Sequence, residues 1–341
     1  MPVSSINIRL FQRMKSRSFI IQAEGWKVVR CWSCQVTAKQ IEVFSPASIA
    51  NLGPGFDVFG IALDGLGDTL KVELVPEPGV KVIVKGLEAE SIPSDPGSNS
   101  AGAVLQYVLK NDDSSRGFVV EVEKGVPPGK GMGSSGASAA GAAYAAIQLL
   151  GLKLSDSEAV KLAAQGEAAV AGSPHADNVS ASLLGGFVMV GADYDVVRLD
   201  PPMFDIVVVV PDIYYENKTR LARSLLPEKV LLKNAVHNVG SASRMAAAIA
   251  MGDAELFGRS ISDNLVEPRR AEMIPDFWNV KQAALDAGAL GCSISGGGPS
   301  LFAVGGDTAR VGRAMADIFQ EAGVESETYL TRPSRLGART I

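Results

Sequence analysis

The chain has 341 residues, of which 47% are hydrophobic and 20% are charged, so it can bury one large core or two ordinary ones, and we expect two domains. A formal net charge of -5 argues against nucleic acid as a partner, and no run of 18 apolar residues predicts a membrane span. The three cysteines are too few for a disulfide framework and indicate a reducing compartment, so we expect a cytoplasmic protein.

The first 40 residues differ in charge from the rest of the chain. They hold seven Lys or Arg residues and one acid, for a charge of +6, which leaves -11 for the remainder. Such an Arg-rich, acid-poor segment is typical of a transit peptide, and a misassigned translation start is the alternative. We therefore predict that residues 1–39 are an N-terminal extension outside the fold. The Cys31-Trp32-Ser33-Cys34 motif stands alone, without the further cysteines or histidines of a zinc site.

Strands dominate the next part of the chain. Residues 41–44 and 69–74 alternate apolar and polar side chains as half-buried strands do, and a strand at 80–84 follows a Pro-Glu-Pro-Gly break. A helix is predicted from about residue 97 to Asn111. The strand predicted at 117–122 then leads the chain into a glycine-rich loop.

The run from residue 126 to 138 places this glycine-rich loop directly before an alanine-rich helix. Pro127 and Pro128 end the preceding strand, and the glycines let the backbone turn its N–H groups inward. We expect Ser134 or Ser135 to cap the helix, so that free N–H donors and the positive end of the helix dipole face one spot, which suits a polyphosphate. The alternative is an ordinary capped helix. A Walker P-loop and a dinucleotide fold are both excluded, because no Gly-Lys-Ser/Thr follows the loop and no acid lies about 20 residues beyond the weak GxGxxG match.

The second half of the chain mixes helices and strands. Ser155 and Glu158 have the spacing of a capping box, which predicts a helix. A strand is predicted at 186–190, and the apolar run 205–210 predicts a buried strand that opens the second domain. The further predicted elements are helices at about 218–226, 233–251, 253–260, 275–287 and 306–322 and strands at 292–295 and 301–304. Because there is no strict βαβ alternation, the predicted fold class is α+β.

Several motifs resemble those of the GHMP kinases, a family of small-molecule kinases. The glycine-rich loop is similar to the family's ATP-binding pattern Pro-x-x-x-Gly-Leu-Gly-Ser-Ser-Ala and departs from it at Met132 and Gly136. Two further segments, residues 45–57 and 175–178, narrow the resemblance to the homoserine kinases.

A third glycine run, at residues 295–300, resembles the family's C-terminal motif, with Gly297 where serine or alanine is common. Taken alone it is compatible with a tight turn between strands, whereas the resemblance implies that it packs under the phosphate-binding loop. The resemblance extends over residues 41–335. It implies a two-domain GHMP kinase architecture, with a ribosomal-S5-like, ATP-binding N-terminal domain at 40–200 and a ferredoxin-like C-terminal domain at 201–335.

The resemblance also implies an activity. This is the ATP-dependent phosphorylation of L-homoserine to O-phospho-L-homoserine in threonine biosynthesis, by direct attack of the substrate hydroxyl on the γ-phosphate in the presence of Mg²⁺. The alternatives are a GHMP kinase for another small alcohol, of the mevalonate or shikimate type, and a non-catalytic sensor of ATP and an amino acid. The expected partner is therefore a small molecule, with a possible homodimer and neither nucleic acid nor membrane.

For the nucleotide, the resemblance assigns Asn99 to the adenine and the glycine-rich loop to the phosphates. The implied nucleotide-binding residues are Asn99, Pro128, Gly129, Lys130, Gly131, Met132, Gly133, Ser134, Ser135, Gly136, Ala137 and Ser138. The implied Mg²⁺ ligands are Ser135 and Glu167, because this ion prefers hard oxygen donors and keeps several waters. Glu167 lies in a stretch of small apolar residues, and the alternative role for it is a solvated position on a helix face.

Homoserine is a zwitterion, so its site needs groups of both charges. The resemblance assigns the substrate carboxylate to Arg223 and Arg270, since a guanidinium fork binds a carboxylate through two hydrogen bonds. Arg220 and Arg269 are adjacent rivals for these roles. The ammonium and hydroxyl side is assigned to Asn51, Asp57, His175 and Asp177.

Catalysis is assigned to Glu167, Asn178 and Thr219. His175 is a tempting general base, but the resemblance places it in contact with substrate. Asn178 stands where relatives such as mevalonate kinase carry an aspartate base, and an amide cannot accept a proton at neutral pH. The implied mechanism therefore depends on positioning and charge neutralisation, with Thr219 near the γ-phosphate.

Overall fold

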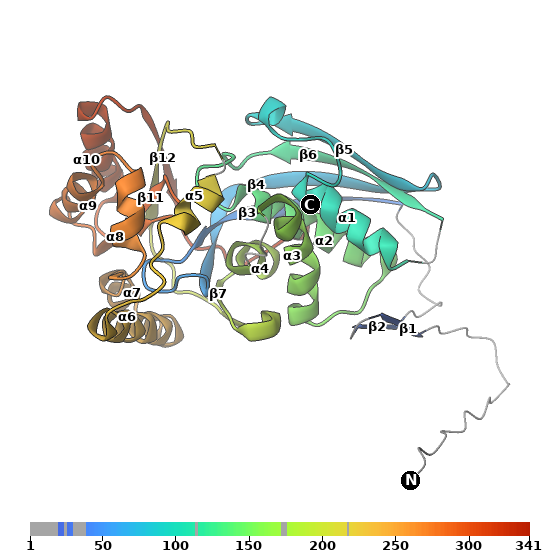
Figure 1. The fold of residues 1–341 in the computed structure, drawn as a ribbon, viewed down its shortest axis with the longest axis horizontal. Helices are drawn as coiled ribbons and strands as arrows, with labels where there is room; N and C mark the ends of the chain where they lie inside the picture. The colour runs from blue at the N-terminus through green and yellow to red at the C-terminus, as the bar shows by residue number, and fades with distance from the viewer. Residues whose placement is uncertain (1–19, 24–25, 30–38, 113–114, 172–175, 217) are drawn as a thin grey trace, which may run out of the picture.

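The computed structural model describes residues 20–23, 26–29, 39–112, 115–171, 176–216 and 218–341, which form two packed domains and a separate small hairpin (Figure 1). The hairpin consists of β1 (Ile20–Ala23) and β2 (Trp26–Val29), which pair only with each other. Cys31 and Cys34 lie outside the described residues. Within the described part of the chain, no helix is long and apolar enough to cross a membrane.

The first domain is a seven-stranded sheet covered on one face by four helices (Figure 1). Its strand order is β13-β3-β4-β6-β5, with β7 and β8 continuing from β4, and β5 and β6 are parallel neighbours. The strands are β3 (Gln40–Ala50), β4 (Phe59–Val75), β5 (Gly79–Gly86), β6 (Gly117–Lys124), β7 (Phe187–Val190), β8 (Val196–Leu199) and β13 (Arg339–Thr340). The helices are α1 (Ser100–Lys110), α2 (Ser134–Leu150), α3 (Asp156–Ala171) and α4 (Ala176–Leu184), and short 3₁₀ turns lie at Ala89–Ser91 and Ala192–Tyr194.

Helix α2 lies at the centre of this domain, where it packs against the sheet and against the other three helices. Its many alanines and glycines permit this close packing. A Cβ atom on Gly141 would lie 2.5 Å from the Leu70 Cδ1 atom, so a larger residue there would require the Leu70 side chain to shift. The predicted capping box at the start of α3 is confirmed, since Ser155 N–H donates to Glu158 Oε2 at 2.7 Å and Glu158 N–H to Ser155 Oγ at 3.3 Å.

The second domain has a four-stranded antiparallel sheet in the order β10-β11-β9-β12. This is the strand order of a βαββαβ ferredoxin-like fold, so that prediction is confirmed. The strands are β9 (Ile206–Pro211), β10 (Gly291–Ile294), β11 (Leu301–Val304) and β12 (Ser326–Thr331). The helices are α5 (Lys218–Ser224), α6 (Leu232–Met251), α7 (Ala254–Arg259), α8 (Glu267–Arg270), α9 (Phe277–Asp286) and α10 (Thr308–Glu321), with a 3₁₀ turn at Ala271–Met273.

Strand β9 is buried over its whole length because both of its faces are covered. Val207 and Val209 point toward α9 and α10. Ile206 and Val208 point the other way, into a core shared with Ile49 and other apolar residues of the first domain. The two domains are therefore joined by a common hydrophobic core.

The end of the chain returns to the first domain. Pro333 forms a bridge with Leu63, and β13 pairs with β3 through Arg339 opposite Phe44. The sequence did not predict β12, β13, α4 or the full length of β4. Strand β4 runs past glycines and aspartates that locally favour a turn, but pairing with β3, β6 and β7 keeps it extended.

Candidate active site

A cavity of about 560 Å³ lies between the two domains. The glycine-rich loop, residues 126–133, forms one wall and is called the phosphate loop below. The second domain contributes α5, Arg270 and a turn at residues 295–300, called the glycine turn. The N-terminal ends of α1 and α2, Glu167 on α3 and Asp177 on α4 also line the cavity.

The phosphate loop reaches the start of α2 through three glycines in the left-handed region. Gly129, Gly131 and Gly133 have φ values of 69°, 89° and 71°. Gly133 is the N-cap of α2, and no side chain accepts a hydrogen bond from the helix start. The prediction that Ser134 or Ser135 caps this helix is therefore wrong: the Ser134 hydroxyl instead donates to the Val126 carbonyl at 2.9 Å. Without a side-chain cap, backbone N–H donors remain for an anion at this helix end.

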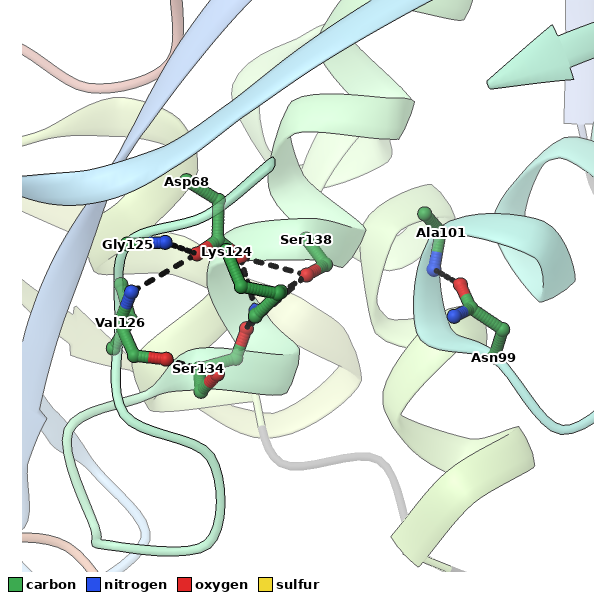
Figure 2. A network of polar contacts seen from close by, with 8 residues as sticks. All are labelled: Asp68, Asn99, Ala101, Lys124, Gly125, Val126, Ser134 and Ser138. Carbon is green, nitrogen blue, oxygen red and sulfur yellow. Dashed lines mark hydrogen bonds and ion pairs between the residues drawn. The ribbon is translucent and has the colours of Figure 1, made fainter. Parts of the chain in front are cut away.

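A buried ion pair holds both ends of the phosphate loop (Figure 2). Lys124, at the end of β6, contacts the Asp68 carboxylate of β4 and donates to the Ser134 carbonyl at 2.9 Å. Asp68 Oδ1 accepts from the N–H groups of Gly125 and Val126 at 3.1 and 3.2 Å, and its Oδ2 accepts from the Ser138 hydroxyl at 2.7 Å. The loop is thus fixed to β4 before it and to α2 after it.

Glu167 and Ser135 supply oxygen atoms beside this loop. Glu167 is only 5% exposed, which rules out the solvated helix face as its environment. Burial raises the pKa of its carboxyl group, while a hydrogen bond with Ser135 and the positive charges of Lys124 and Lys218 act in the opposite direction. A hydroxyl and a carboxylate at the edge of a phosphate-binding loop are donors that suit Mg²⁺.

Arg223 and Arg270 both lie in the cavity lining, and their rivals do not. Arg270 is buried and donates to the Gly296 carbonyl at 2.9 Å, while Arg269 is exposed. Arg223 forms an ion pair with Asp57 at 2.8 Å, and Arg220 is exposed.

Both cavity-lining arginines contact the ring of Phe56. The guanidinium carbons of Arg223 and Arg270 lie 5.8 and 5.0 Å from the centroid of its ring. The two guanidinium groups, both positively charged, therefore lie near one aromatic ring at one end of the cavity.

The acidic and amide groups predicted for the substrate lie at the same end. Asn51 donates from Nδ2 to the Gly296 carbonyl at 2.7 Å, and its Oδ1 accepts from the Asp57 N–H at 3.0 Å. Burial, with a smaller effect from the negative charges of Asp57 and Glu167, raises the pKa of Asp177 to about 7. A bound ammonium group would compensate the negative charge of this buried carboxylate.

Asn178 also lines the cavity, and its Oδ1 accepts a hydrogen bond from the Ser48 hydroxyl at 3.0 Å. This bond fixes the orientation of the Asn178 amide. His175 and the side chain of Thr219 lie outside the described residues.

The other predicted nucleotide-binding residues differ in their surroundings. Asn99 lines the cavity, and its Oδ1 caps α1 by accepting hydrogen bonds from the N–H groups of Ala101 and Gly102. Figure 2 shows the bond to Ala101. Met132 and Ala137 are fully buried in the apolar core and do not line the cavity.

Four more residues of that set lie in the phosphate loop or beside it. Gly136 packs against Asn178, with 3.1 Å between a Cβ built on the glycine and the Asn178 Cβ. Pro128, Gly129 and Lys130 line the cavity, and Lys130 forms an ion pair with Asp212 at 3.0 Å.

The glycine turn contacts the phosphate loop directly, as the sequence predicted. The hydroxyls of Ser295 and Ser300 donate to the carbonyls of Gly131 and Lys130 at 2.8 and 2.6 Å. A Cβ on Gly131 would lie 2.4 Å from the Ser295 carbonyl oxygen, so the approach requires glycine. A segment of the second domain thus supports the loop of the first.

Sequence reasoning missed several cavity-lining residues. Among them are Lys124, which pairs with Asp68, Lys218, which begins α5, and Tyr215 in the loop before α5. No local pattern marks them. The one available signal was position, since Lys124 ends the strand that leads into the phosphate loop and Lys218 directly precedes Thr219.

Comparison with known proteins agrees with this geometry. Residues 99–186 match the family profile described as GHMP kinases N terminal domain, and residues 245–324 match that described as GHMP kinases C terminal. The chain is 42% identical over 293 residues to the homoserine kinase of Methanocella arvoryzae, covering 85% of this chain and 94% of that protein. It is 39% identical over 302 residues to the homoserine kinase of Pyrococcus abyssi, covering 86% and 97%.

Solved structures of similar fold also include GHMP kinases. The homoserine kinase from Cytophaga hutchinsonii superposes with a TM-score of 0.82 at 37% identity, over 90% of this chain and 99% of that one. The L. major mevalonate kinase in complex with R-mevalonate shares the fold, with a TM-score of 0.66 at 17% identity over 87% and 98%. With two matching domain profiles and relatives of about 40% identity over most of its length, the chain belongs to the GHMP kinase family.

Proposed function

We propose that the chain transfers the γ-phosphoryl group of ATP to the hydroxyl of L-homoserine, giving O-phospho-L-homoserine for threonine biosynthesis. One observation carries the proposal: a phosphate loop, a buried arginine and a buried carboxyl group line a single cavity, and the latter two suit the two charges of an amino acid. The similarity to homoserine kinases along most of the chain supports the same substrate.

The phosphate loop and the N-terminus of α2 bind and orient the phosphates through backbone N–H groups. Ser135 and Glu167 would hold Mg²⁺, which when bound neutralises phosphate charge. The substrate hydroxyl oxygen forms a bond to the γ-phosphorus while the bond from that phosphorus to the ADP oxygen breaks, and the hydroxyl proton leaves to water. Asn178 orients the hydroxyl and takes no proton. Thr219 is proposed, by resemblance, to assist near the γ-phosphate.

At the other end, Arg270 and Arg223 bind the homoserine carboxylate, and Asp177 and Asn51 bind its ammonium group. Asp57 pairs with Arg223 and so sets the position of that guanidinium. His175 joins this set by resemblance alone. Binding at both charged ends places one hydroxyl against the γ-phosphate, which is the main contribution that such an enzyme makes.

The rival functions require different charged groups in the cavity, and the residues that line it disfavour both rivals. Mevalonate and shikimate carry a carboxylate but no ammonium, so either would leave Asp177 buried without a cation. A sensor of ATP and an amino acid has no need of the hydrogen-bonded Ser135 and Glu167 beside the phosphate loop.

A coupled assay of ADP release, with saturating ATP and Mg²⁺, tests the proposal. Homoserine should release ADP at least about 100-fold faster than mevalonate, shikimate or no acceptor, since only homoserine satisfies both charged ends. Phosphorus NMR should show a phosphate monoester on the homoserine oxygen. Equal ADP release with another alcohol would point to the first rival, and nucleotide binding without ADP release under any condition would point to the sensor.

A further inference from the structure

Lys218 begins α5 and extends its side chain toward the cavity. Its Nζ donates to the Gly298 carbonyl of the glycine turn at 2.5 Å. The same carbonyl oxygen lies 2.7 Å from the position of a Cβ on Gly131. The ammonium group is therefore separated from the phosphate loop by a single carbonyl group.

The charges around the lysines that line the cavity distinguish Lys218 from the other two. Lys124 is paired with Asp68, and Lys130 is paired with Asp212. Within the described part of the chain, no carboxylate lies within ion-pair distance of Lys218. A carbonyl dipole satisfies one of its N–H donors but does not neutralise the charge.

The electrostatic surroundings of Lys218 reflect this lack of a counter-ion. Burial, and after it the positive charges of Arg270 and Lys130, lower the pKa of Lys218 to about 8, while Glu167 acts in the opposite direction. A partly buried cation that lies beside a phosphate loop without a carboxylate at ion-pair distance is arranged for an anionic ligand. Glu167 and the loop bound the space that this ligand would occupy.

We propose that Lys218 is a further catalytic residue, which binds the γ-phosphoryl group of ATP and stabilises its negative charge as it moves to the acceptor. The inference rests on the proposed function for its acceptor and adds a residue to it. Lys218 forms no covalent bond in the step. Its ammonium remains against the equatorial phosphoryl oxygens while the bond to ADP breaks and the bond to the homoserine oxygen forms.

Nucleotide binding gives the first test, and it does not depend on turnover. Calorimetry with Mg²⁺ would compare Lys218→Met with wild type for ADP and for the non-hydrolysable ATP analogue AMP-PNP. The variant should bind AMP-PNP at least about 10-fold more weakly and ADP within about 3-fold of wild type, because only the analogue carries a γ-phosphoryl group. Arg220→Met, an exposed change on the same helix, is the matched control and should match wild type for both ligands.

Kinetics give the second test. Lys218→Met should lower kcat about 10²-fold with a smaller change in the KM for homoserine, and Lys218→Arg should recover part of the loss. Equal weakening of ADP and AMP-PNP would show that Lys218 only anchors the glycine turn, and unchanged binding and kcat would show that it does not contact the phosphate; either result overturns the proposal. If wild type phosphorylates a different alcohol, the proposed function fails, but the contrast between AMP-PNP and ADP still decides the role of Lys218.

Discussion

Arg269 and Arg270 are neighbours in α8, yet only Arg270 is buried in the cavity lining. Truncating a charged group that binds a carboxylate through paired hydrogen bonds costs about 2–4 kcal/mol. Arg270→Leu should therefore lower kcat/KM for homoserine about 30-fold to 1000-fold, mainly through KM, and leave the KM for ATP close to wild type. Steady-state kinetics with each substrate varied in turn would measure this.

Two controls accompany that change. Arg269→Leu should have little effect, because its side chain is exposed. Homoserine with an amidated carboxylate should be a poor substrate for wild type and should lose little more in Arg270→Leu, since both changes remove one shared interaction. A damaging Arg269→Leu, or an amide that is phosphorylated as well as homoserine, would refute the carboxylate assignment.

Asp177 should make the unliganded protein less stable at alkaline pH. Its pKa is about 7 in the folded protein against an ordinary value of 3.8, so the folded state binds more protons between these values and stability falls as pH rises from about 4 to about 7. Asp177→Asn should raise the free energy of unfolding at pH 8 by about 1–3 kcal/mol, and the gain should vanish near pH 4. Urea denaturation of both proteins at the two pH values measures the difference, and a gain that is independent of pH would contradict the titration.

At the scale of elements, the Asp68–Lys124 pair connects β4, β6 and the start of α2. Removing one member of a buried ion pair leaves the other charge uncompensated and costs about 3–5 kcal/mol. Asp68→Asn should show a loss of this size in chemical denaturation, together with weaker ADP binding, because the Gly125 and Val126 N–H groups lose their charged acceptor.

The double variant Asp68→Asn, Lys124→Met separates the pair from its surroundings. Its destabilisation should be clearly smaller than the sum of the two single changes, because it leaves no isolated charge. Simple additivity would mean that the two groups do not compensate each other in the fold.

The same elements show what the sequence can and cannot predict. The alanine-rich α2, the valine run of β9 and the capping box of α3 were predicted because their signals are local. Asp68 and Lys124 are 56 residues apart and meet only through pairing of β4 with β6, so no local pattern could connect them.

Lys218 and Gly298, 80 residues apart, meet in the same way through the tertiary fold. The cap of α2 was predicted wrongly for a different reason. The Ser134 hydroxyl is drawn to the Val126 carbonyl, which a tertiary turn brings within reach, and Gly133 takes the N-cap position.

At the scale of the whole molecule, the cavity residues come from residues 50–297. The hairpin of β1 and β2 forms a sheet of its own and supplies none of the described cavity lining. Deleting residues 1–38 should therefore leave kcat, both KM values and the melting temperature nearly unchanged. Differential scanning fluorimetry and the coupled assay would check this, and a loss of several degrees would mean that the deleted segment stabilises the folded domains.

The return of the chain to the first sheet has a consequence for how the two domains can separate. The second sheet and its helices lie between β8 and β13, both of which pair within the first sheet, and Figure 1 shows the C-terminus lying over the first domain. The second domain is thus an insertion in the first, tethered at two points. A protease that cuts only the connection between β8 and β9 would leave two fragments that stay associated. In the nicked protein, pairing of β13 with β3 and the core shared by the two domains would keep the glycine turn beside the phosphate loop, so nucleotide binding should be retained.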